Sequence, residues 1–176
     1  MKKTLLWSLF VLAGAILAAA PQEKVWDYSK ELPMNNAALQ MRYLPDVKTP
    51  DNHGVIEVIQ PVPMEKILYY SHIQFPLKTE FLKNGDTVEV SFYVKGEPGT
   101  AIEMRCTEVL PYSGHFSETK AFGLKGEWQK ITATFTIRNL YGEAYSCVPR
   151  MLFPKHEAGK PFYFGPLTIK NLGVQK

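Results

Sequence analysis

The sequence has few cysteines, few histidines and almost no net charge, and each scarcity narrows the kind of protein that it encodes. Its 20 Lys and Arg nearly balance its 17 Asp and Glu, and without Lys2 and Lys3 the formal charge falls from +3 to +1. A nearly neutral chain with no run of basic residues lacks the surface that nucleic acid or another polyanion requires. The 4 histidines are too scattered to form a ligand set, so we expect neither a metal nor another cofactor.

Recognisable catalytic motifs are absent as well. The sequence contains no nucleophile elbow, glycine-rich phosphate loop, zinc-ligand spacing or calcium loop. A glycosidase pair stays open as an alternative, because it needs only two carboxylates about 5 to 10 Å apart and acids are plentiful. The predicted strands leave little chain for a deep cleft, so we expect a protein that is not an enzyme.

The N-terminal stretch "MKKTLLWSLFVLAGAILAAA" has the layout of a secretory signal peptide, with lysines, an apolar run and small residues at its end. The run is short for a membrane span, and no stop-transfer pattern follows it. We therefore expect residues 1–20 to be removed and residues 21–176 to form one exported domain, secreted or periplasmic and not held in a membrane. Its length of about 156 residues suffices for a domain with its own core.

The 2 cysteines are Cys106 and Cys147. In the oxidising compartment that export implies, they are expected to pair as a disulfide, and a pair of buried free thiols is the alternative. Closing a loop of about forty residues would stabilise the fold by up to ~4 kcal/mol in the chain-entropy account of disulfides.

Beyond residue 20 no segment has helical periodicity, but short runs rich in Val, Ile, Thr, Tyr and Phe alternate with turn residues. The predicted strands are 24–28, 38–43, 54–59, 66–77, 86–95, 101–109, 116–124, 128–137, 146–153 and 162–172. Signals such as "KNGD", "GEPG", "LKGE" and "HEAGK" mark turns, and residues 44–52 are predicted to be a loop. Strands at this spacing predict an all-β fold, an antiparallel β-sandwich of two sheets.

The stretch "AIEMRC" alternates with a period of two, as a strand with one buried face does. Its apolar row is Ile102, Met104 and Cys106. Glu103 and Arg105 belong to the opposite face, which is either the solvated back of a sheet or a binding surface.

Two other strands send polar residues to a face of the same kind. Tyr70, His72 and Gln74 lie opposite the apolar row of "KILYYSHIQFPL". In "SCVPRMLF", placing Cys147 inward sends Arg150 outward. If the two cysteines pair, their strands are neighbours or meet across the core, and the arginines of both strands share the opposite side.

These positions predict a surface of planar hydrogen-bond donors and acceptors. Its residues are Tyr70, His72, Gln74, Glu103, Arg105 and Arg150. Guanidinium and carboxylate groups make bidentate hydrogen bonds to vicinal hydroxyls, and a tyrosine ring packs on the apolar face of a sugar, so a polyhydroxylated ligand is one interpretation. The other is an intramolecular Arg–Glu ladder on a solvated sheet, which contributes little stability.

Three stretches, "FLKNGDTVEVSFYVKGEPGTAIEMRC", "KGEWQKITATFTI" and "FYFGPLTIKNL", resemble the carbohydrate-binding modules of families four, nine and twenty-two, which are galactose-binding-domain-like jelly rolls. The matching positions are Leu82, Gly85, Val88, Ser91, Phe92, Lys95, Trp128, Gln129, Thr134, Phe135 and Thr136. Trp128 matches a core position of the family pattern. The resemblance covers most of residues 21–176 and implies a jelly-roll sandwich whose concave sheet binds a polysaccharide or oligosaccharide without catalysis.

By strand position, the resemblance transfers the binding surface to the six residues named above, and Tyr112 and His115 in "PYSGHF" would line one end of the groove. Residues 164–167 read "FGPL" where the family often has an acidic residue that helps to hold calcium, so no such ion is expected. Trp26 and Trp128 offer no exposed platform, which favours a groove for soluble chains. The expected partners are a glycan and a separate glycan-degrading enzyme or surface complex. The alternative is an exported structural or protein-interaction sandwich without glycan specificity.

Overall fold

The computed structural model describes residues 22–35, 39–61, 72–75, 81–107, 119–137, 148–152 and 159–174, with the backbone alone for 106–107 and 148–152. The strands in these ranges are β1 (Gln22–Val25), β2 (Met34–Asn35), β3 (Gln40–Lys48), β4 (Gly54–Ile59), β5 (His72–Gln74), β6 (Asp86–Lys95), β7 (Ala101–Thr107), β8 (Lys120–Gly123), β9 (Gln129–Thr136), β10 (Val148–Leu152), β11 (Pro161–Phe164) and β12 (Thr168–Val174).

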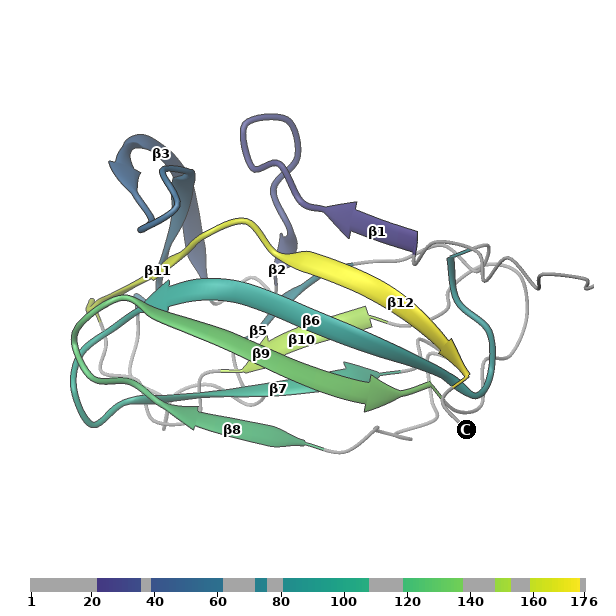
Figure 1. Cartoon of the computed structure of the whole chain (residues 1–176). Coiled ribbons are helices and arrows are strands. Elements are labelled where there is room, and N and C mark those ends of the chain that lie inside the picture. Colours follow the sequence, from purple (N-terminus) through teal and green to yellow (C-terminus); the bar gives the residue numbers. More distant parts are fainter. Residues whose placement is uncertain are drawn as a thin grey trace, which may run out of the picture.

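These strands form two antiparallel sheets that pack face to face (Figure 1). The larger sheet has seven strands in the order β1-β12-β6-β11-β4-β3, with β9 also paired to β6. The smaller sheet has five strands in the order β2-β5-β10-β7-β8. Because most neighbours in each sheet are distant in sequence, the chain crosses repeatedly between the layers, as it does in a jelly roll. The predicted all-β sandwich is confirmed.

The core lies between the sheets and consists of the inward residues of alternating strands. The inward row of β6 is Val88, Val90, Phe92 and Val94, each at most 2% exposed. The ring of Phe164 in β11 lies 5.8 Å from that of Phe92. Ile73 and Met104 of the smaller sheet belong to the same buried cluster. Each such large apolar side chain stabilises the fold by roughly 1.5–3 kcal/mol relative to leaving it exposed.

The turns predicted at "KNGD" and "GEPG" are present, and both depend on the freedom of glycine, whereas residues 156–158 of "HEAGK" lie outside the described residues. Gly85 in "KNGD" and Gly99 in "GEPG" have φ angles of +90° and +84°, which residues with a Cβ rarely adopt. The amide of Gly85 donates to the carbonyl of Ile137, closing the end of the β6–β9 pair. These turns fix where β6 starts and where the chain leaves it for β7.

The loop predicted for residues 44–52 is wrong in its first half, because β3 continues to Lys48. The strand lies at the edge of the larger sheet, where Pro45 needs no ladder partner for its missing N–H. The register shifts between Leu44 and Lys48, which marks a bulge in this part of the strand. The turn itself is shorter than predicted and lies at 49–53, where Asn52 donates to the carbonyl of Thr49 and has φ 67°.

The strand predicted for residues 162–172 is divided into β11 and β12 by a bend at residues 165–167. Gly165 is packed so closely that a Cβ there would lie 2.6 Å from Cγ2 of Thr49 and 3.3 Å from Cβ of Tyr93. The hydroxyl of Tyr28 donates a hydrogen bond to the carbonyl of Gly165. The Gly165–Pro166 dipeptide is a local turn signal, and across it the buried row changes from Phe162 and Phe164 to Leu167 and Ile169, so the sequence does mark this break.

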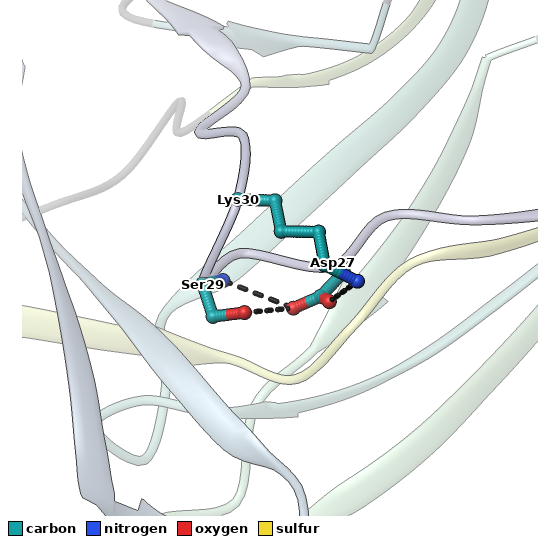
Figure 2. A network of polar contacts seen from close by, with 3 residues as sticks. All are labelled: Asp27, Ser29 and Lys30. Carbon is teal, nitrogen blue, oxygen red and sulfur yellow. Dashed lines mark hydrogen bonds and ion pairs between the residues drawn. The ribbon is translucent and has the colours of Figure 1, made fainter.

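The first strand was predicted for residues 24–28. In the structure it is β1, which covers Gln22–Val25, and a turn follows it. Figure 2 shows Asp27 accepting hydrogen bonds from the amide and hydroxyl of Ser29 and pairing with Lys30. Lys30, and then Ser29, lower the pKa of Asp27 to about 2. After this turn the chain forms β2, a strand of two residues that was not predicted.

The other predicted strands are confirmed within the residues that the structure describes. The bounds of β4 and β6 are those predicted. Of the strand predicted for 66–77, the structure describes 72–74 as β5, and residues 62–71 lie outside the described ranges. Trp26 is 2% exposed, as expected of a core residue. Trp128 is only half-buried, because it precedes the first residue of β9 at the end of the sheet.

Candidate functional site

The smaller sheet has one face toward the core and one face away from it. Ile73 of β5 and Met104 of β7 are fully buried against the larger sheet. Residues directly opposite each other in an antiparallel pair share a face, and alternate residues of a strand take opposite faces. The positions that alternate with Ile73 and Met104 therefore form what we call the outer face of the smaller sheet.

The register of three neighbouring strands brings the predicted polar residues together on this outer face. In one row, Gln74 of β5 lies opposite Arg150 of β10, which lies opposite Arg105 of β7. In the adjacent row on the same face, Leu152 lies between His72 and Glu103. The prediction that Arg105 and Arg150 share a side is confirmed. Tyr70, Tyr112 and His115 lie outside the described residues.

The described side chains of the outer face form two pairs, one on each side of β10. Nη2 of Arg105 donates to Oε2 of Glu103 at 2.9 Å, and these side chains are 21% and 26% exposed. Nε2 of Gln74 lies 2.5 Å from Nε2 of His72. Both pairs hold planar hydrogen-bonding groups in fixed, half-buried positions.

The expected alternative, an Arg–Glu contact within the sheet, is therefore present. Glu103 and Arg105 are two residues apart in β7, so their ion pair joins no two strands. Ion pairs of this kind typically contribute up to about 1 kcal/mol. Their contact orients the guanidinium but does not hold β7 to a neighbouring strand.

The edges of the outer face are less polar than its centre. Met34 of β2 lies opposite Gln74 and is 60% exposed. On the other edge, Ala121 and Gly123 of β8 lie opposite Glu103 and Ala101. A Cβ at Gly123 would meet nothing within 4 Å. The contribution of Met34 could not be predicted from the sequence, because a strand of two residues has no alternation to detect.

The expected disulfide is not tested by the described residues. The strands β7 and β10 are antiparallel neighbours, which is one of the two arrangements expected for the bond, and Cys106 lies opposite Pro149. Cys147, two residues before Pro149 in the sequence, lies outside the described residues. The bond between the two cysteines stays a prediction.

Among the residues that the structure describes, no three His, Cys, Asp or Glu side chains are grouped as a metal site would require. Among the same residues, no helix has the length and apolarity to cross a membrane.

The fold is similar to several solved carbohydrate-binding modules. The CBM22-1 xylan-binding domain from Paenibacillus barcinonensis is 12% identical, with 81% of this chain and 86% of that one covered and a TM-score of 0.56. A CBM22-1–CBM22-2 tandem from the same organism is 17% identical, with coverage of 87% and 51% and a TM-score of 0.62. The family 11 module from Clostridium thermocellum, in complex with a beta-1,3-1,4-mixed-linked tetrasaccharide, is 13% identical, with coverage of 86% and 96% and a TM-score of 0.54.

No protein-family profile matches the sequence, and no curated protein matches it. The similarity to solved structures therefore establishes the fold alone, at identities of 12% to 17%. The chain thus has the jelly-roll fold of carbohydrate-binding modules, as the sequence motifs implied.

Proposed function

We propose that this protein binds carbohydrate without catalysis through the outer face of the smaller sheet, which would be the concave face of the sandwich. The observation that carries this proposal is the register that places Gln74, Arg150 and Arg105 side by side across three strands. The similar fold of modules named for xylan or mixed-linked glucan supports it.

The chemistry of the outer face suits a polyhydroxylated ligand. Guanidinium, carboxylate, amide and imidazole groups supply donors and acceptors in fixed planes. Because Glu103 and Arg105 are already held by each other, a ligand need not order them, which lowers the entropic cost of binding. Met34, and Tyr70 outside the described residues, would supply apolar contact to sugar rings.

A glycoside hydrolase is less well supported by this surface. A hydrolytic site needs two carboxylates flanking the scissile bond. Within the strands of the smaller sheet that the structure describes, Glu103 is the one acidic residue at an outer position. Its carboxylate is bound to Arg105.

We also propose that the protein is exported after residues 1–20 are removed. It would then act together with a separate glycan-degrading enzyme or surface complex. The layout of the N-terminal stretch supports export. A non-catalytic module would raise the local concentration of a partner enzyme on its substrate, since joining two binding events makes the second one effectively intramolecular.

Affinity electrophoresis of the purified protein through gels containing β-glucan, xylan, mannan or galactan tests the proposal. At least one polysaccharide should retard migration, and the Gln74→Ala and Arg105→Ala variants should lose most of that retardation. Thr134→Ala is the matched control, because Thr134 is an exposed strand residue on the larger sheet.

Two outcomes would contradict the proposal. If no glycan retards the protein, the interaction sandwich without glycan specificity becomes the better account. If Thr134→Ala weakens retardation and the Gln74 and Arg105 variants do not, binding occurs on the other sheet.

A further inference from the structure

Three aromatic side chains of the larger sheet lie outside the hydrophobic core. Tyr93 in β6, Tyr163 in β11 and Trp128, which directly precedes β9, are each half-buried. None of them belongs to the core cluster or to the partly buried apolar residues packed against it. Core packing therefore does not account for these rings, and Trp128 does not occupy the core position expected from the family pattern.

The strand register brings the three rings to one end of the larger sheet, where β6 ends and β9 begins beside β11 (Figure 1). Tyr163 lies opposite Lys95, which follows Tyr93 by two residues in β6. On the other side of β6, Tyr93 lies opposite Lys130, and Trp128 precedes Lys130 by two residues. Alternate residues of a strand take the same face, so these positions share the face turned away from the smaller sheet. Rings gathered on one surface, unlike rings scattered singly, indicate a site of interaction.

Contacts within the sheet hold two of the rings in place. Nζ of Lys130 lies 5.8 Å from the ring centroid of Tyr93. Burial, followed by the charge of Glu57 and a hydrogen bond to its carboxylate, raises the pKa of Tyr163. Because Glu57 is the residue opposite Tyr163 in β4, this hydroxyl points at the neighbouring strand and the ring lies along the sheet. Rings already held in this way lose little conformational freedom when a ligand packs on them.

We propose that this aromatic cluster, made of Tyr93, Tyr163 and Trp128, is a second carbohydrate site on the sheet opposite the first. The apolar face of a sugar ring packs on an aromatic ring, and the ammonium groups of Lys95 and Lys130 donate hydrogen bonds to sugar hydroxyls. This goes beyond the proposed function, which needs only the smaller sheet. A module with a site on each sheet holds two stretches of a polysaccharide at once, because the second contact becomes effectively intramolecular.

Tryptophan fluorescence tests the proposal without any substitution. Of the 3 tryptophans, Trp7 lies in the stretch expected to be removed on export, and Trp26 is 2% exposed. Quenching of the exported protein by acrylamide should therefore report on Trp128. A polysaccharide that retards the protein, among β-glucan, xylan, mannan and galactan, should reduce this quenching and shift the emission to shorter wavelength, because sugar replaces water over the indole. The shift should persist in Arg105→Ala, which changes only the first site.

Substitutions then measure the contribution of the rings. Trp128→Ala and Tyr93→Ala should each weaken binding of the polysaccharide roughly two- to tenfold, as expected for the loss of one aromatic contact. Trp128→Phe keeps an aromatic ring and should lose less. Thr134→Ala is the matched control, because Thr134 is exposed on the same face but lies farther along β9.

The outcomes separate this proposal from the proposed function. If Trp128 stays equally quenched with every glycan that retards the protein, the aromatic cluster is not a carbohydrate site, and binding by the smaller sheet still stands. The same holds if the shift disappears in Arg105→Ala while Trp128→Ala leaves retardation unchanged. A shift that grows with protein concentration and needs no glycan would instead assign the cluster to contacts between copies of this chain. Failure of every glycan both to retard the protein and to shift its emission would overturn the proposed function as well.

Discussion

The two sheets use their ion pairs for different purposes. In the larger sheet, Nε of Arg42 donates to Oε2 of Glu57 at 2.6 Å, and this contact joins the edge strand β3 to β4. In the smaller sheet, the Arg105–Glu103 pair lies within β7 and joins no strands. A cross-strand pair helps to assemble a sheet, whereas a pair within one strand fixes side chains on its surface. The first joins two strands, and the second holds two side chains in place on the outer face of one strand.

Their outer faces differ in the same way. The outer row of β9 in the larger sheet is Thr132, Thr134 and Thr136, all exposed hydroxyls on a strongly paired strand. The outer rows of the smaller sheet combine guanidinium, carboxylate, amide and imidazole groups in half-buried pairs. Alternation identifies an outer face in both sheets, but only the gathering of several functional groups distinguishes a candidate site.

The largest expected effect on stability comes from the core that both sheets share. Phe164→Ala removes a ring that is 1% exposed and lies against Phe92 and Phe162. It should lower the free energy of unfolding by about 3–5 kcal/mol, from lost burial and the cavity left behind. Urea denaturation measures this loss. Thr134→Ala should change stability by less than about 0.5 kcal/mol, and an equal loss for both variants would contradict the assigned core.

The next effect concerns the junction of β7 and β10. If Cys106 and Cys147 form a disulfide, reduction should lower the free energy of unfolding by about 2–4 kcal/mol. Intact-mass measurement of the denatured protein should show a gain of two hydrogen atoms on treatment with reductant. Free thiols in the untreated protein would refute the bond, and the smaller sheet would then rely on packing and backbone pairing alone.

Removing the arginine of the larger sheet's ion pair tests the different roles assigned to the two ion pairs. Arg42→Ala leaves Glu57, whose side chain is 8% exposed, without its guanidinium partner. It should lower the free energy of unfolding, because a buried acceptor loses its charged donor. Glycan binding should be unchanged in this variant. If Arg42→Ala weakened binding while Arg105→Ala did not, the roles assigned to the two sheets would be reversed.

The smallest effect is a pH-dependent one at the bend between β11 and β12. Burial raises the pKa of Tyr28 above its usual value of 10.0, and a hydrogen bond from the backbone of Leu167 opposes this only in part. The native state thus favours the neutral phenol. Stability should be intact below pH 10 and should fall as pH rises above it, because only the unfolded chain then releases this proton.

Tyr28→Phe separates this titration from others in the molecule. The variant loses the hydrogen bond to the carbonyl of Gly165 and should be about 0.5–1.5 kcal/mol less stable at neutral pH. The difference from the parent protein should narrow above pH 10. Thermal unfolding followed from pH 7 to 11 measures both trends, and parallel profiles for the two proteins would exclude Tyr28 as the cause.

The sequence predicted the elements whose patterns are local. The bounds of β4 and β6, the inward rows and the glycine turns follow from alternation and from the backbone freedom of glycine, which neighbouring residues alone impose. The predicted strand 162–172 ran through the bend at Gly165 although Gly165–Pro166 is a local turn signal. What only the tertiary structure shows there is the close approach of Thr49 and of Tyr93 in β6, which leaves no room for a Cβ. The predicted strands also omit β2, a strand of two residues that is recognised by its pairing with β5.

For the candidate site, the sequence by itself determined which residues of each strand could lie on an outer face. Only the tertiary structure decided which of them became neighbours. Arg105 and Arg150 are opposite each other because β10 pairs with β7 in one register, and a shift of one residue would turn every side chain of β10 to the other face. A chain with no run of basic residues thus acquires a pair of arginines at the centre of its smaller sheet, because pairing between strands, and not their order in the sequence, sets their distance.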